Sequence, residues 1–247
     1  KLFLDDIFNK FHANMVGEQK ADSVYEVSGL QFLVNLKGLS DIGITNNQIE
    51  KVNEIIEETI NSLLNNPNSR ELFIKLCESE GFFIGHSLLI IYIAGRICRE
   101  ANHNFLSTMK KICAASFYHD FSLFALDVKY DELKAVEITD PDLLKQVLDH
   151  PSASAHFLPA NIELLEDTKK IITEHHELPN GDGYPRKLTA SQIAPLSCLF
   201  ILSQQISFCL IRNNFSQDRL KDFLVNSEST FDQGNFSKYY QLALTIF

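Results

Sequence analysis

The chain has 247 residues, of which 45% are hydrophobic and 22% charged, and its formal net charge is −10. This composition is typical of a folded globular protein and excludes a largely disordered chain. Because the charge is negative and no long basic run occurs, a nucleic acid polymer is not expected as a partner.

Hydrophobic periodicity predicts a mostly helical chain. Near the start, residues 24–44 alternate roughly like an extended segment with glycines as breaks, so short strands are expected there. Helices are then expected at 47–65, 69–80, 82–101, 106–118, 141–150, 168–176, 191–211, 217–225 and 237–246. The fifth begins at Pro141, since proline suits the first helical position, and is expected to end near His150-Pro151. The sequence therefore predicts an all-α fold, a helical bundle.

A soft boundary near residues 66–81 divides the chain into two expected domains. Residues 1–80 would form a small regulatory or packing module that includes the short strands, and residues 81–247 the helical domain. The most apolar run, 198–211, contains Gln204 and Gln205 and is too short to span a membrane, so a buried core helix is expected.

The sequence has five cysteines and no CxxC pair, and because most of them lie in apolar helical patterns, buried reduced thiols are expected. Reduced thiols indicate a reducing compartment, and no secretory leader is visible in the sequence. We therefore expect the protein to act in the cytoplasm.

Five histidines and one aspartate share a metal-binding chemistry although they are far apart in the sequence. They are His86, His119, Asp120, His150, His175 and His176. Singly, each has an ordinary explanation, such as a core histidine or a residue that stabilises a helix end. Together they offer neutral imidazoles and a carboxylate, which bind transition metals, and one carboxylate can bridge two ions. We expect them to form one cation centre, of the kind that two-metal phosphoryl transfer uses.

In order and spacing, these residues resemble the HD-GYP family, a branch of the HD-superfamily metal-dependent phosphohydrolases. The resemblance covers about residues 82–210, and its most specific part is His175-His176-Glu177 followed by Gly181-x-Gly183-Tyr184-Pro185. It implies an all-helical HD domain from a bacterial signalling protein. It also implies hydrolysis of cyclic di-GMP or a related cyclic dinucleotide.

The resemblance also implies two divalent metal ions, iron or manganese in preference to zinc. The metal ligands that it implies are His86, His119, Asp120, His150, His175, His176 and Gln205. His119 and Asp120 would be the catalytic residues, and Glu177 would orient an imidazole. The ligand-binding loop would consist of Gly181, Asp182, Gly183, Tyr184 and Pro185, which we call the GYP loop. Protein partners are also expected to bind through this loop.

The sequence departs from the family pattern at several positions. Leu123 stands where the family has a lysine three residues after the aspartate, and leucine can neither carry charge nor donate a hydrogen bond. Gln205, or Gln204 if the register shifts by one, stands in place of the last metal-binding aspartate. Phe82 replaces the glutamate of trinuclear members, so a third metal is not expected. Of the arginine-rich stretch near the end of the domain, Arg212 remains.

These observations leave three functional hypotheses. The first is a metal-dependent cyclic di-GMP phosphodiesterase with an atypical dinuclear site. The second is a catalytically inactive signalling or scaffold module that binds metal or a cyclic dinucleotide. The third is a helical domain whose histidines are all structural. Turnover with added metal, ligand calorimetry and metal analysis distinguish the three.

Overall fold

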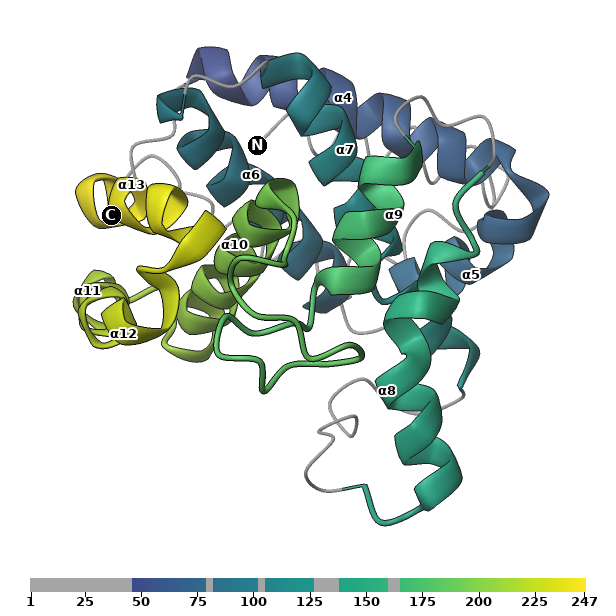
Figure 1. Cartoon of the computed structure of the whole chain (residues 1–247). Helices are drawn as coiled ribbons and strands as arrows, with labels where there is room; N and C mark the ends of the chain where they lie inside the picture. Colours follow the sequence, from purple (N-terminus) through teal and green to yellow (C-terminus); the bar gives the residue numbers. More distant parts are fainter. Residues whose placement is uncertain (1–45, 79–81, 102–104, 127–137, 160–164) are drawn as a thin grey trace.

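The computed structural model describes residues 46–78, 82–101, 105–126, 138–159 and 165–247, and over these it is helical (Figure 1). Its elements are α4 (Asn46–Asn65), α5 (Pro67–Glu78), α6 (Phe82–Glu100), α7 (Phe105–Tyr118), η1 (Phe121–Ala125), α8 (Pro141–Ala155), α9 (Leu165–Glu174), α10 (Pro195–Arg212), α11 (Gln217–Asn226), α12 (Glu228–Phe231), η3 (Gly234–Phe236) and α13 (Ser237–Ile246). The described residues contain no strand beyond one isolated bridge between Asn180 and Thr189. The all-α prediction is confirmed, whereas the strands expected at 24–44 lie outside the described residues.

Helix α6 forms the centre of the core. It packs most extensively against α10 and α7, and α4 and α13 also contact it. Apolar side chains on every side of α6 are buried, including Ile90, Ile91 and Ile93. An apolar helix without a polar face is stable only when neighbours surround it, and here they do. Two polar residues interrupt this surface, His86 and Ser87, and both are completely buried.

The first two described helices belong to the same core. Ile55, Ile56 and Leu63 of α4 and Phe73 of α5 lie in one continuous hydrophobic cluster with α6 and α7. The phenyl ring of Phe73 makes an edge contact with Phe117, at 6.1 Å between centroids. The division expected at residues 80 and 81 stays a prediction, although this packing joins both sides of it.

By length and composition α10 alone among the described helices could cross a membrane, yet 61% of it is buried inside the fold. Its buried side chains face α6 and α9, as those of a core helix do. The helix begins at Pro195, later than the expected start at 191. Residues before it form a turn instead, in which the Gln192 and Ile193 N–H groups donate to the carbonyl of Thr189.

Helix α8 is longer than the sequence predicts. α8 continues through Pro151 to Ala155, so the prediction that it ends near residue 150 is wrong. A proline inside a helix removes one donor, and the carbonyl four residues earlier then lacks its helical partner. Here that carbonyl, of Val147, accepts a hydrogen bond from the His150 side chain instead.

Candidate metal centre

Four elements bring the predicted ligands together. His119 and Asp120 follow the last residue of α7, and His175 and His176 follow the last residue of α9. These two helices pack side by side, so their ends meet (Figure 1). His150 comes from α8, and α6 contributes His86 near its start. All six are buried except His176, which is half-buried.

Three of the imidazoles make the same local hydrogen bond. In each, Nδ1 lies close to the backbone carbonyl three residues earlier: 2.8 Å from Ser116 for His119, 2.5 Å from Val147 for His150, and 2.6 Å from Ile172 for His175. A carbonyl oxygen only accepts, so Nδ1 carries the proton and Nε2 presents its lone pair. Ser116 and Ile172 lie in the last turns of their helices, where carbonyls have no helical donor.

The three Nε2 atoms converge on one carboxylate. His150 Nε2 lies 3.1 Å and His175 Nε2 3.4 Å from Oδ1 of Asp120, while His119 Nε2 lies 3.1 Å from Oδ2. The Nε2 atoms of His150 and His175 are 3.1 Å apart. Together with His176, the residues Asp120, His150 and His175 offer ligand atoms within 4.8 Å of one another. We call these four residues the four-ligand cluster.

In this cluster, the imidazole lone pairs and the carboxylate oxygens, which are all acceptors, face one another. A positive charge is therefore needed between them. A proton on an imidazole is disfavoured, because burial lowers the pKa of His175 to about 4 and that of His176 well below its usual value. Burial would raise the pKa of Asp120, but the adjacent His119 and the imidazole contacts hold it well below its usual value. Neutral imidazoles around an ionised carboxylate fit a divalent metal ion.

The second group of imidazoles is looser. The rings of His86 and His119 lie 5.8 Å apart between centroids. His86 Nδ1 is 2.9 Å from the Ser207 hydroxyl, and the His86 ring stacks on Phe208 at 4.3 Å. Burial and the nearby His119 lower the pKa of His86 to about 3, so this ring too is neutral. The two oxygens of Asp120 thus face different imidazoles, as a bridging carboxylate would.

Helix α10 carries Gln204 on the face that packs against this second group. The ring centroids of Phe200 and His119 lie 5.5 Å apart, and Ser207 and Phe208 contact His86. Residue 204 lies between them on the same helical face, whereas residue 205 is rotated away by a further 100°. Gln204 is buried, its Oε1 has no hydrogen-bond partner among the described residues, and Gln205 is only half-buried.

The GYP loop covers the four-ligand cluster from the His176 side. The Tyr184 ring stacks on His176 with 4.5 Å between centroids, and the Tyr184 N–H donates to the His176 carbonyl. Gly183 packs so closely that a Cβ there would lie 2.2 Å from the Leu178 nitrogen and 2.5 Å from the His176 oxygen. Only glycine fits, so the GYP loop lies directly against the chain that carries the ligands.

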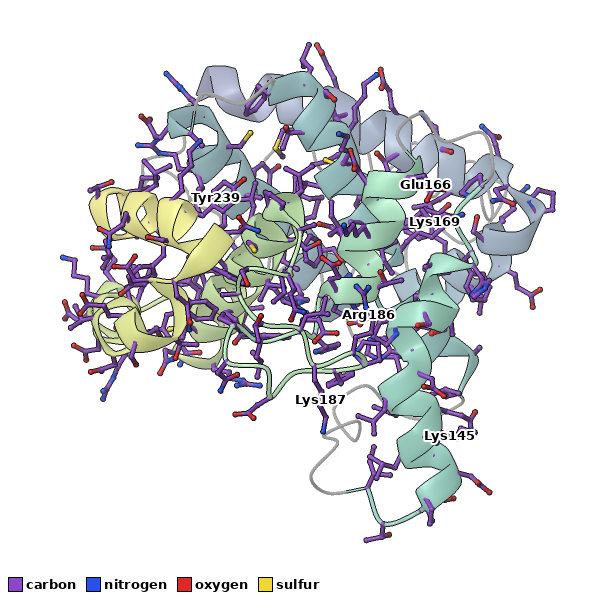
Figure 2. The ribbon with its side chains drawn as sticks, in the orientation of Figure 1. Lys145, Glu166, Lys169, Arg186, Lys187 and Tyr239 are labelled. Atoms are coloured by element: carbon purple, nitrogen blue, oxygen red, sulfur yellow. The ribbon has the colours of Figure 1, made fainter. Side chains whose placement is uncertain are left out.

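Two buried glutamates hold the segment that follows the GYP loop. Glu177 was expected beside an imidazole, but its Oε1 and Oε2 accept from the N–H groups of Arg186 and Leu188, at 2.7 and 2.8 Å. Glu174, which belongs to none of the predicted motifs, accepts from the Arg186 guanidinium at 2.8 Å and from the Ala194 N–H at 2.9 Å. Arg186 lies beside the end of α9 (Figure 2). In the sequence, the available signal was an acidic residue directly before two predicted ligands.

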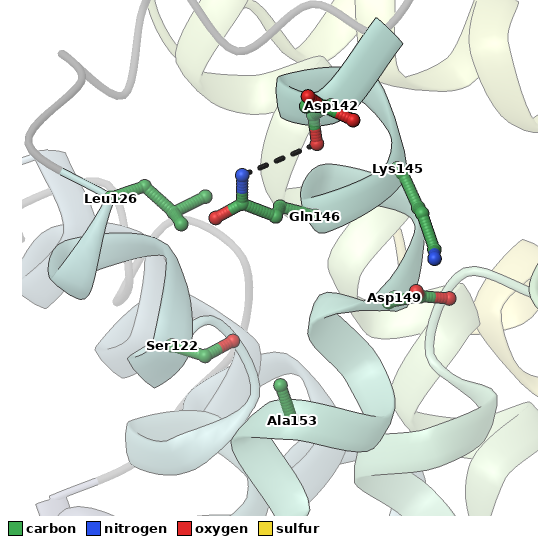
Figure 3. A pocket seen from close by; sticks show the side chains of 7 residues that line it. All are labelled: Ser122, Leu126, Asp142, Lys145, Gln146, Asp149 and Ala153. Atoms are coloured by element: carbon green, nitrogen blue, oxygen red, sulfur yellow. Dashed lines mark hydrogen bonds between the residues drawn. The ribbon is translucent and has the colours of Figure 1, made fainter.

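Leu123 is buried in η1, where its side chain is 5% exposed. The neighbouring Ser122 ties η1 to α8, because its N–H donates to the Ser154 hydroxyl and its own hydroxyl to the His150 carbonyl. A cavity of about 480 Å³ opens between η1 and α8 (Figure 3). Its lining includes Asp142, Lys145 and Asp149, and none of the six predicted His and Asp ligands.

Comparison with known proteins agrees with this architecture. No curated protein matched the sequence. Among solved structures, the chain resembles the HDG"Y"P protein Bd1817 from Bdellovibrio bacteriovorus, with a TM-score of 0.53 and 12% sequence identity over 98% of this chain and 77% of that chain. At this identity the likeness shows the fold alone. The model of the HD domain family matches residues 52–204, which include all six His and Asp ligands. The chain therefore belongs to the HD domain family, as its motifs predicted.

Proposed function

We propose that the protein binds two divalent metal ions, iron or manganese in preference to zinc, and hydrolyses a phosphodiester. The observation that carries the proposal is the convergence of the His119, His150 and His175 lone pairs on Asp120. One ion would be held by the four-ligand cluster. The other would be held by His86, His119 and Asp120, with Gln204 or Gln205 as a further oxygen ligand.

Two bound ions would supply Lewis acidity for an in-line displacement at phosphorus and would activate the attacking water. The chain's own groups prepare this chemistry. Three backbone carbonyls fix the imidazole tautomers, which fixes the direction of each lone pair. Asp120 would join the two ions through its separate oxygens, and Tyr184 shields the ring of His176 from water on one face.

We propose a cyclic dinucleotide, cyclic di-GMP or a close relative, as the substrate class. Its support is the His-His-Glu and Gly-x-Gly-Tyr-Pro string, together with the fold shared with an HDG"Y"P protein. The GYP loop borders the four-ligand cluster, where it would contact the ligand, and Asp182 is exposed for contact with a protein partner.

The buried Leu123 favours a second candidate function, that of a metal-bearing cyclic dinucleotide receptor without turnover. A lysine at this position would place an ammonium near the substrate phosphate, and the leucine cannot. Removing one positioned electrostatic donor costs on the order of 100- to 1000-fold in rate. The metal ligands do not depend on this residue, so metal and nucleotide binding would survive the loss of activity.

A turnover assay tests the first candidate. The full chain is loaded with Mn²⁺ or, without oxygen, with Fe²⁺, and is incubated with cyclic di-GMP while products are separated by chromatography. Product from the wild type, and none from Asp120→Asn, supports the phosphodiesterase. No product with either metal, from protein shown to contain metal, rejects it.

Calorimetry on the same metal-loaded protein then tests the second candidate. It shows whether a protein without turnover still binds cyclic di-GMP, as a receptor does. Saturable binding of cyclic di-GMP without turnover supports the receptor. The matched variant is His175→Ala, which removes a ligand of the cluster and should abolish nucleotide binding together with metal binding. Equal nucleotide binding by the variant and the wild type would contradict a metal-dependent pocket.

We also propose that the protein acts in the cytoplasm. Cys98, Cys113 and Cys198 are buried free thiols, and burial raises the pKa of the Cys98 thiol to about 11. Thiols of this kind suit a reducing compartment. Fractionation of cells that express the protein, with antibody detection, checks the location.

A further inference from the structure

A second cavity, of about 370 Å³, lies between α7, α9 and the start of α10, and none of the six predicted His and Asp ligands lines it. The lining residues of α7 and α9 belong to their first two turns, and those of α10 to its first turn. We call this cavity the α10 pocket. It is lined chiefly by Ser107, Lys111, Asp167, Lys170, Leu196 and Ser197.

The start of α10 leaves donors without partners at this pocket. The residue before the helix, Ala194, provides no side-chain cap, and Pro195 has no N–H. Among the described residues, the N–H groups of Leu196 and Ser197 donate to no backbone or side-chain acceptor outside α10, and within a helix the first N–H groups have none. Helix N-termini with such N–H groups favour anions.

An independent observation comes from the Ser197 side chain. It is completely buried, and its hydroxyl has no hydrogen-bond partner among the described residues. A buried hydroxyl without a partner costs free energy, so a ligand that accepts its hydrogen bond would be stabilised there. Glu174, which accepts from the Ala194 N–H before the helix, is also engaged by Arg186.

The charges around the pocket favour an anion. The ammonium of Lys111 lies 2.5 Å from the Asp167 carboxylate, so these two charges cancel. Lys170 forms no ion pair among the described residues, so its charge remains available. The adjacent Lys169, which does not line the pocket, lies 3.8 Å from Glu166 instead, and Figure 2 shows both at the same end of α9.

We propose that the α10 pocket binds the phosphate group of a small molecule, separately from the metal centre. A phosphate offers several acceptor oxygens, which match two backbone N–H groups, the Ser197 hydroxyl and an ammonium. The volume of the α10 pocket exceeds that of one phosphate ion. The pocket therefore has room for a phosphomonoester, such as a nucleoside monophosphate, and also for free phosphate.

Phosphate titration of the metal-stripped full chain, followed by amide resonances in NMR spectra, tests the proposal. Inorganic phosphate and GMP are titrated separately, with guanosine as the ligand that lacks phosphate. The expected result is a saturable shift of the Leu196 and Ser197 amides with phosphate, GMP or both, and none with guanosine. Shifts with GMP but not with phosphate would identify a phosphomonoester site. If phosphate and GMP bind with equal affinity, the pocket is a site for the free ion.

Matched variants locate the binding. Lys170→Gln and Ser197→Ala should each weaken binding by about tenfold, as expected for a lost hydrogen bond to a charged group. Lys169→Gln and Ser203→Ala are the controls, since Ser203 is a buried serine of the same helix whose hydroxyl donates to the Leu199 carbonyl. Absence of a saturable shift, or equal affinity in all four variants, would overturn the proposal.

Discussion

The imidazole of His150 donates from Nδ1 to the carbonyl oxygen of Val147, across 2.5 Å. In an uninterrupted α-helix, this carbonyl would accept from the backbone N–H of residue 151, which is a proline and has none. The proline thus leaves free the acceptor that sets the tautomer of His150. As a result, Nε2 presents its lone pair to Asp120, 3.1 Å away.

Pro151→Ala should therefore weaken metal binding although it removes no ligand. The new N–H would compete for the Val147 carbonyl, and His150 would lose the hydrogen bond that orients it. Loss of such an orienting partner costs about tenfold or more in metal affinity. Competition with a chromophoric chelator measures the change for Mn²⁺.

Pro141→Ala serves as the control, because Pro141 is the exposed first residue of the same helix. It should leave the metal affinity unchanged. Thermal unfolding of both metal-free variants shows whether either fails to fold, and Pro151→Ala should unfold at or above the wild-type temperature. An unchanged metal affinity in folded Pro151→Ala would show that the proline does not act through His150.

Helix α8 around this proline also separates what the sequence predicts from what it does not. Ligand types and order were predictable, because His119-Asp120 and His175-His176 stand at the ends of strongly periodic helices. The end of α8 was not, because a proline normally interrupts a helix, and the compensating bond from His150 is a side-chain contact that periodicity does not encode.

Tertiary contacts account for the other residues that the sequence did not reveal. Glu174 reads as an ordinary last residue of a helix, yet it is completely buried and joins Arg186 to the start of α10. Likewise, a register difference of one residue separates Gln204 from Gln205, and counting along the sequence cannot distinguish which of them faces α6. The packing of Phe200 and Ser207 does.

The position of Gln204 leads to a prediction about the second ion. Gln204→Asp should raise the affinity for the second equivalent of Mn²⁺, because it places a carboxylate on the face of α10 that contacts His86 and His119. Gln205→Asp, the matched variant one residue further on, should have little effect. Isothermal titration gives both affinities. A rise with Gln205→Asp alone would assign the ligand position to residue 205 instead.

Gly183→Ala should displace the GYP loop. The added Cβ would overlap backbone atoms of residues 176–178, which cannot move aside as a flexible side chain would. Destabilisation of about 3 kcal/mol is expected, at the upper end for overpacked sites. In Gly181→Ala, the added Cβ would lie 3.6 Å from its nearest atom, which is ordinary contact. Only the backbone strain of a φ of +80° would then destabilise this variant, by about 1 kcal/mol.

Urea unfolding of the metal-free proteins measures both variants. Equal destabilisation by the two alanines would show that the close approach at Gly183 is not what fixes the loop.

Leu123→Lys should increase phosphodiester turnover if the missing ammonium limits the rate. An increase on the order of 100-fold is expected from one restored electrostatic donor. Leu123→Met is the neutral control of similar length and should not change the rate. Because residue 123 is buried, the lysine should also lower stability in the absence of ligand. Equal rates for Lys and Met, with metal bound in both, would exclude this explanation.

Anomalous X-ray scattering from crystals of the full chain, grown without chelators and with Mn²⁺ present, shows whether these histidines and Asp120 hold bound metal together. Two peaks are expected, one beside each oxygen of Asp120, and His175→Ala should lose the peak at the four-ligand cluster. Crystals of well-folded protein without any peak near Asp120 would rule out a shared metal centre.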